Sequence, residues 1–129
     1  MRSVKRKFVK QIIQLLTLLA IFTSSAMAAY PDKPIKMMIG YAPGSSTDIV
    51  GRIIANDLSI ALKQPVIVEN RGGAAGSLAA DAVAKSTPDG YTVLFAQNGL
   101  AINVAANPKL PFNGQKDFIP VVEIGRAHV

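Results

Sequence analysis

The stretch IKMMIGYAPGSSTDIVGRIIANDLSIAL, residues 35–62, decides the fold. Its first seven residues form an apolar run of the length of a β-strand, and residues 42–44 are typical of a turn. From residue 46 to residue 62 the apolar side chains recur at the three- and four-residue spacing of an amphipathic helix. Ser45 and Asp48 have the spacing of a capping box at the start of that helix. The stretch therefore predicts a strand, a short loop and a helix in succession.

The residues that follow repeat this alternation. PVIVEN (65–70) and YTVLFA (91–96) are short and rich in β-branched or aromatic residues, which favours strands. Between them lie a Gly/Ala loop at 71–76 and a second amphipathic segment at 77–85. The order β-α-β-α-β with short links predicts an α/β fold in which helices pack on a parallel sheet through right-handed crossovers.

The first 28 residues have the pattern of a secretory signal peptide. Residues 1–10 hold five cations and no acid, residues 11–22 are almost wholly apolar, and Ala26-Met27-Ala28 is a small-residue triplet typical of a cleavage site. The apolar run is shorter than the ~20 residues that span a bilayer. We expect cleavage after Ala28 and export. The alternative is an uncleaved anchor on a membrane-tethered sensory module, which mass spectrometry of the exported N-terminus would distinguish.

The C-terminal part of the chain is less regular. A short Ala-rich stretch covers residues 101–106, and DFIPVV at 117–122 predicts the beginning of a further strand. Residues 123–129 read EIGRAHV, which a widely used sequencing adapter encodes when read in frame. We interpret 123–129 as a non-native tail, a hypothesis that resequencing tests, and assign no role to its His128.

Composition narrows the function classes. The whole chain has a formal charge of +6, but all eight acids and only nine of the 14 basic residues follow residue 28, which leaves about +1. No basic stripe remains for a phosphate backbone, so we expect no nucleic-acid partner. The chain has no cysteine and therefore no disulfide framework or thiolate metal site.

Three loops are placed to form a binding site. In a parallel sheet, ligands bind beyond the carboxyl ends of the strands, which here lead into residues 41–48, 70–77 and 97–99. The first two loops run into helix N-termini, where free N–H groups carry roughly half an elementary positive charge. Glycines let a ligand approach the backbone, and the first loop adds three hydroxyls, those of Ser45, Ser46 and Thr47. The expected ligand is a small anion.

Each of these features also has a purely structural explanation. Ser45 could only cap its helix, and Asp48, itself an anion, is suited to ordering the loop rather than contacting a carboxylate. Arg71 could pair with a ligand or simply be solvated. Tyr41 could line a cleft or close the core.

The sequence predicts no catalytic residue, metal site or cofactor. It contains no G-x-S-x-G nucleophile elbow. It also lacks a G-x-x-x-x-G-K-[ST] phosphate loop, H-E-x-x-H and G-x-G-x-x-G. Without His128, no histidine is available as a base.

A set of motifs runs along the chain in a fixed order: PDKPI (31–35), APGSSTDIV (42–50), QPVIVENR (64–71), Gly76, PDGYT (88–92), NPKLPF (107–112) and Asp117-Phe118. Taken together, these motifs resemble the Bug family, the receptors of tripartite tricarboxylate transporters. The resemblance covers nearly all of residues 30–122. It implies that residues 29–122 are part of domain 1 of a two-domain, type II periplasmic binding protein. Such a protein captures a small organic acid in its interdomain cleft for membrane transporter subunits, and we expect a monomer.

The family pattern also implies which residues contact the ligand. Carried over position by position, it indicates the first loop and the loop after the third strand: Tyr41, Gly44, Ser45, Ser46, Thr47, Gln97 and Asn98. Two departures stand out. Where this chain has Ser45, the family usually has a second glycine, and the Cβ of Ser45 narrows a ligand's access to the backbone. Where this chain has Gly72-Gly73, the family usually has Pro-Gly, and the two glycines make the second loop more flexible.

One alternative from another function class is a secreted α/β enzyme whose catalytic residues lie in a C-terminal half. A downstream histidine paired with a nucleophile would favour the enzyme, whereas a second α/β lobe with hinge strands would favour the receptor. In either case the predicted sheet lacks neighbours along its edge. We therefore expect residues 29–122 alone to be marginally stable and to bind carboxylates poorly. Micromolar binding in a calorimetric titration would contradict this expectation.

Overall fold

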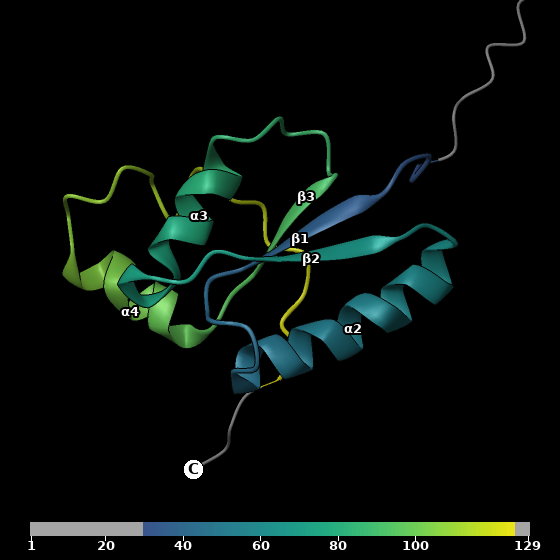
Figure 1. Ribbon diagram of the computed structural model, residues 1–129. Coiled ribbons are helices and arrows are strands. Elements are labelled where there is room, and N and C mark those ends of the chain that lie inside the picture. The colour runs from purple at the N-terminus through teal and green to yellow at the C-terminus, as the bar shows by residue number, and fades with distance from the viewer. Residues whose placement is uncertain (1–29, 126–129) are drawn as a thin grey trace, which may run out of the picture. The chain divides into compact units, whose positions relative to one another are not determined.

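The computed structural model describes residues 30–125, whose compact unit begins at Pro31 (Figure 1). The predicted signal peptide and the last residues of the predicted tail lie outside the described residues. Residues 30–125 form three strands, three α-helices and a short 3-10 turn: β1 (Ile35–Ile39), α2 (Ser46–Leu62), β2 (Val66–Asn70), η1 (Ala74–Gly76), α3 (Ser77–Ala84), β3 (Thr92–Phe95) and α4 (Asn98–Ala106). The predicted β-α-β-α-β order is confirmed.

The three strands form a parallel sheet with the order β2-β1-β3. β1 lies in the centre, pairing Ile35 with Val66 at one end of β2 and Ile39 with Asn70 at the other. On its other side β1 pairs Ile39 with Phe95 of β3. Because all three strands run in the same direction, their carboxyl ends meet at one edge of the sheet.

The two crossover helices cover opposite faces of this sheet. α2 connects β1 to its neighbour β2, and α3 connects β2 to β3 in the opposite direction across the sheet. Right-handed crossovers in opposite directions place their helices on opposite faces. Figure 1 shows this arrangement, with α2 below the sheet and α3 above it.

The core lies between β1 and α2. Met37, Ile39 and Ala55 are buried there, and Ile39 is fully inaccessible. Gly51 brings the helix close, since a Cβ at this position would lie 2.5 Å from Cδ1 of Ile39. On the other face, the buried Ala79 and Ala80 provide α3 with the small side chains that a close approach requires. Full burial of a side chain such as Ile39 contributes about 1.5–3 kcal/mol.

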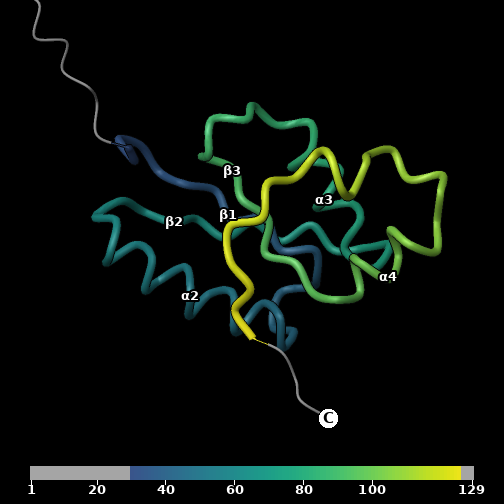
Figure 2. Tube along the Cα trace, turned by 180° about the vertical axis from the view of Figure 1, so that it is seen from behind, coloured from purple at the N-terminus to yellow at the C-terminus, as the bar shows by residue number. Residues whose placement is uncertain are grey.

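One predicted boundary and one predicted strand are corrected by the structure. β1 ends at Ile39 rather than residue 41. The Ala-rich stretch at 101–106, to which the sequence assigned no structure, forms most of α4, which begins at Asn98. Residues 117–122 form no strand; Figure 2 shows them as an irregular trace that passes the sheet on the side turned away from the viewer in Figure 1. Pro120 has no N–H to donate to a ladder, and Ile119 and Val121 stand 90% and 87% exposed without a strand beside them.

Among the described residues, no helix combines the length and the apolar character that a membrane crossing requires.

The close approach of two backbones at the carboxyl edge generates a first prediction. A Cβ on Gly40 would lie 2.5 Å from Cα of Gly76, and a backbone atom cannot move aside as a flexible side chain can. Gly40→Ala should therefore lower the free energy of unfolding by about 1–3 kcal/mol, measured by urea denaturation. Gly72→Ala is the matched control, because its Cβ would meet its nearest neighbour at an ordinary 3.4 Å. Equal stability of the two variants would contradict the packing described here.

Candidate functional site

The loops that follow β1 and β2 converge at the carboxyl edge of the sheet, and Tyr41 lies between them and the start of α4. The N–H of Arg71 donates to the carbonyl of Ile39 at 2.8 Å, which holds the first two strand ends together. A Cβ on Gly72 would lie 3.4 Å from the Tyr41 carbonyl carbon, and one on Gly99 would lie 3.0 Å from the Tyr41 hydroxyl. Tyr41 therefore lies against the loop after β2 and the first turn of α4, which follows β3.

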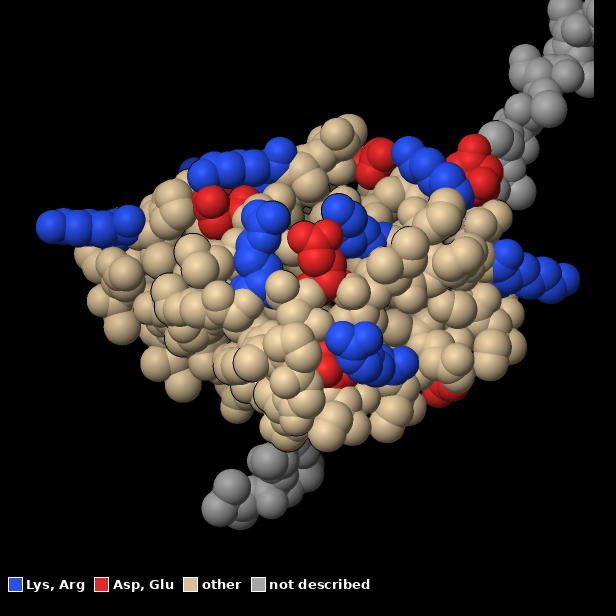
Figure 3. All heavy atoms as spheres, viewed as in Figure 1, with Lys and Arg blue, Asp and Glu red and all other residues tan. Residues whose placement is uncertain are grey.

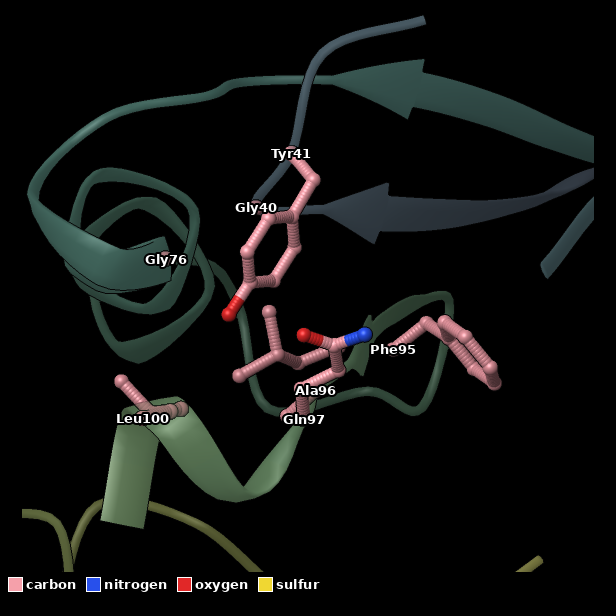
Figure 4. A pocket seen from close by; sticks show the side chains of 8 residues that line it. Gly40, Tyr41, Gly76, Phe95, Ala96, Gln97 and Leu100 are labelled. Atoms are coloured by element: carbon pink, nitrogen blue, oxygen red, sulfur yellow. The ribbon is translucent and has the colours of Figure 1, made fainter. Parts of the chain in front are cut away.

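A narrow hollow lies beside Tyr41 and has no room for a water molecule. Figure 4 shows the Tyr41 ring and the Gln97 side chain extending into the space between the ends of β1 and β3. The hollow is lined by Gly40, Tyr41, Gly76, Leu94, Phe95, Ala96, Gln97 and Leu100. Of the residues that the sequence assigned to the ligand, Tyr41 and Gln97 line it. Asn98 lies next to Gln97 as the first residue of α4 and is exposed.

The first turn of α2 leaves two amide donors available. Ser45 is the N-cap, and its Oγ accepts from the N–H of Asp48 at 3.3 Å. Within the described residues, the N–H groups of Ser46 and Thr47 donate to no partner, which is the usual condition of a helix start. Ser46 is exposed, whereas Thr47 is only 4% exposed and can present little of its surface to a ligand.

Gly44 allows the first loop to turn through its backbone conformation. Its φ of +80° lies in the left-handed region that favours glycine. Its N–H donates to Oδ2 of Asp48 at 2.8 Å, so this amide is already engaged inside the loop. The predicted role of Gly44 in ligand contact remains a prediction, and the structure shows the residue in a loop-ordering hydrogen bond.

A buried polar cluster beneath the loop was only partly anticipated from the sequence. Asp48 is 2% exposed, and its Oδ2 accepts from Arg52 Nε at 3.0 Å in addition to Gly44. Its Oδ1 accepts from Asn70 Nδ2 at 2.7 Å. The sequence indicated that Asp48 orders the loop, and it offered one signal for Arg52, the i,i+4 spacing on the same helix. It offered none for Asn70, which joins the cluster only through strand pairing.

The partners of Asp48 keep it ionised. Hydrogen bonds from Arg52 above all, and then from the N–H of Gly44 and the amide of Asn70, lower the pKa of Asp48 from 3.8 to about 2. The cluster is therefore an ion pair at neutral pH, with the negative charge held on the inner side of the loop.

The second loop is held mainly by α4. Nδ2 of Asn103 donates to the Ala74 carbonyl at 3.0 Å and to Ser77 Oγ at 2.6 Å. Gly76 is the N-cap of α3 with a φ of +89°, which a glycine adopts without strain. Arg71 is half exposed and lies 3.7 Å from Glu69, so in this structure it is a solvated surface cation. The sequence did not indicate Asn103.

Charged side chains of both signs alternate on the face shown in Figure 3. Lys36 pairs with Glu69 at 2.9 Å, and Lys33 pairs with Asp89 at 3.2 Å. In the part of the chain that the structure describes, no group of three or more acidic or histidine side chains is placed to hold a metal ion.

Comparison with known proteins now identifies the family. The family model for the tripartite tricarboxylate transporter family receptor matches residues 50–129. The chain belongs to this receptor family. The resemblance read from the loop motifs and the predicted α/β fold are thereby confirmed.

Relatives and solved structures agree with this assignment. The chain is 39% identical to the protein BugT of Bordetella pertussis over 121 residues, which cover 87% of this chain and 37% of BugT. MatC of Rhodopseudomonas palustris, solved with bound malate, is 39% identical with a TM-score of 0.62 over 71% of this chain and 32% of MatC. A structure described as a periplasmic transporter is 47% identical with a TM-score of 0.50 over 51% of this chain and 22% of its own. The chain spans about a third of the length of the curated relatives that it matches.

The pKa of Asp48 generates a second prediction. Because the pKa is lower in the folded chain than in the unfolded chain, the stability that Asp48 contributes is complete above about pH 4 and is lost as the pH falls through about 2. The melting temperature of the wild type should exceed that of Asp48→Asn at pH 5, and the gap should close toward pH 2, as followed by circular dichroism. Asp57→Asn, on the exposed side of the same helix, is the control. A gap that stays constant across this range would contradict the prediction.

Proposed function

We propose that the protein is an extracytoplasmic receptor that captures a small organic acid for a tripartite tricarboxylate-type transporter. The observation that carries the proposal is the meeting of the strand-end loops around Tyr41, with the free amide of the exposed Ser46 at the start of α2. In this reading the protein binds its ligand and performs no chemistry on it.

The physical basis is the electrostatics of the first loop. An α-helix of 17 residues places a partial positive charge at its start, and α2 directs this end toward the carboxyl edge of the sheet. N–H groups without partners at that end are suited to a carboxylate. The hydroxyls of Ser46 and Tyr41 and the amide of Gln97 add neutral donors, which fix orientation without adding charge.

The relatives support the same ligand class. The receptor family takes its description from tricarboxylate transport, and MatC, which aligns with 71% of this chain, was solved with malate. For this chain we propose a small carboxylate of this kind, without choosing one acid.

The small size of the hollow fits a shared site. A pocket that holds a small ligand normally buries most of its surface, whereas the hollow beside Tyr41 has no room even for a water molecule. We propose that residues 29–122 supply one wall of a cleft and that a second lobe, which the family resemblance implies, supplies the other. Cleavage after Ala28, a periplasmic location and a monomeric state belong to the same proposal.

A binding experiment tests the proposal directly. In isothermal titration calorimetry, the protein expressed from the complete gene should bind at least one small dicarboxylate. Malate and adipate are the first probes. Replacing a ligand carboxylate by an uncharged amide should weaken binding, because the amide gains nothing from the positive helix start. Absence of binding across a panel of mono-, di- and tricarboxylates, or equal affinity for acid and amide, would contradict the proposal.

The hollow supplies a residue-level prediction. Gln97→Ala should raise the dissociation constant for the bound carboxylate about two- to tenfold, the effect of one lost neutral hydrogen bond. Gln115→Ala removes the same side chain from an exposed turn and should leave the constant unchanged. An unchanged constant in Gln97→Ala would exclude Gln97 from the site.

A further inference from the structure

We propose that Asn70 is a positioning residue, which sets the geometry of the anion-facing loop by joining both of its ends to the carboxyl end of β2. The inference rests on the proposed carboxylate-binding function. Asp48 and Arg52 act with Asn70 as one cluster.

The geometry of Asn70 carries the inference. Asn70 is the last residue of β2 and lies beside Ile39, the last residue of β1. Its Nδ2 donates to the carbonyl of Tyr41 at 3.1 Å, where the loop begins, and to Oδ1 of Asp48 at 2.7 Å, where the loop enters α2. One side-chain amide therefore spans the loop that contains Gly44 and Ser46.

An asparagine suits this position chemically. Both hydrogens of Nδ2 are used, and Oδ1 accepts from Nη2 of Arg52 at 2.9 Å. An aspartate would provide no donor for the Tyr41 carbonyl and would place a second carboxylate against Asp48. An alanine would leave the Tyr41 carbonyl and Oδ1 of Asp48 without this partner.

The cluster also controls the charge beneath the loop. A buried carboxylate close to a site for an anion opposes binding unless its charge is neutralised. Arg52 supplies the compensating charge at 3.0 Å, from a side chain that is half exposed. Removing Arg52 alone should therefore weaken carboxylate binding, and removing the charge of Asp48 at the same time should restore part of it.

The elements joined by Asn70 provide a matched control. Ser59 also links α2 to β2, but at the far end of both elements: its Oγ accepts from Val66 N–H at 2.8 Å and donates to the Ala55 carbonyl at 2.7 Å. Ser59→Ala removes an inter-element link of similar strength without touching the loop. Comparing Ser59→Ala with Asn70→Ala therefore distinguishes an effect of lower stability from an effect of altered loop geometry.

The first experiment compares melting temperature and carboxylate affinity in the complete protein, using whichever panel acid the wild type binds. Both Asn70→Ala and Ser59→Ala should lower the melting temperature. Asn70→Ala should raise the dissociation constant about tenfold or more, the effect of losing two hydrogen bonds that order the loop, while Ser59→Ala should leave it within about twofold. Wild-type affinity in folded Asn70→Ala would overturn the inference.

A rescue experiment with a second substitution tests the cluster even if Asn70→Ala does not fold. Arg52→Gln should weaken carboxylate binding, and Asp48→Asn combined with Arg52→Gln should bind more tightly than Arg52→Gln alone. A double variant that binds no better than Arg52→Gln would overturn the charge argument. If the wild type binds no carboxylate at all, the proposed function fails; if the wild type binds and these variants bind equally well, only the present inference fails.

Discussion

The contact between the Gly40 and Gly76 backbones is the constraint on which the carboxyl edge depends. Gly40 follows the central strand and Gly76 is the N-cap of α3, and a Cβ on Gly40 would lie only 2.5 Å from Cα of Gly76. This contact brings the start of α3 against the end of β1, so that the second loop lies beside Tyr41. A wider separation would leave the loops after β1 and β2 as independent surface turns, and the starts of α2 and α3 would not lie at one edge of the sheet.

The fold could be predicted because its signals are local. Alternating short apolar runs and helical periodicity fix the order of the elements, and a parallel sheet with right-handed crossovers then follows from general rules. The same reasoning failed for residues 117–122, where an apolar run resembles a strand. A strand is defined by its partner, and in the described structure no neighbouring strand pairs with this segment, which contains Pro120.

The site could be predicted only in outline. The loops and their helix starts follow from element order. Tyr41 and Gln97 were indicated by the family resemblance; they line the hollow, and their contact with a ligand stays a prediction. Asn70 and Asn103 could not be found in the same way, because each acts through side-chain contacts with residues 29 positions away. An asparagine at a strand end or within a helix has many possible roles, and only the packing of α2 and α4 selects one.

The carboxylate of Asp48 lies beneath the proposed anion site, where a negative charge would be expected to repel the ligand. This carboxylate accepts hydrogen bonds from Gly44, Arg52 and Asn70 at once, which a neutral side chain could not do as strongly. As a consequence, the N–H of Gly44 is engaged by Asp48 and is not available to a ligand. The gain is a loop that is ordered before binding, with its remaining free amides on Ser46 and Thr47 at the start of α2. Because a preorganised loop loses less entropy when a ligand arrives, a neutralised carboxylate in this position is compatible with the proposed capture of an anion.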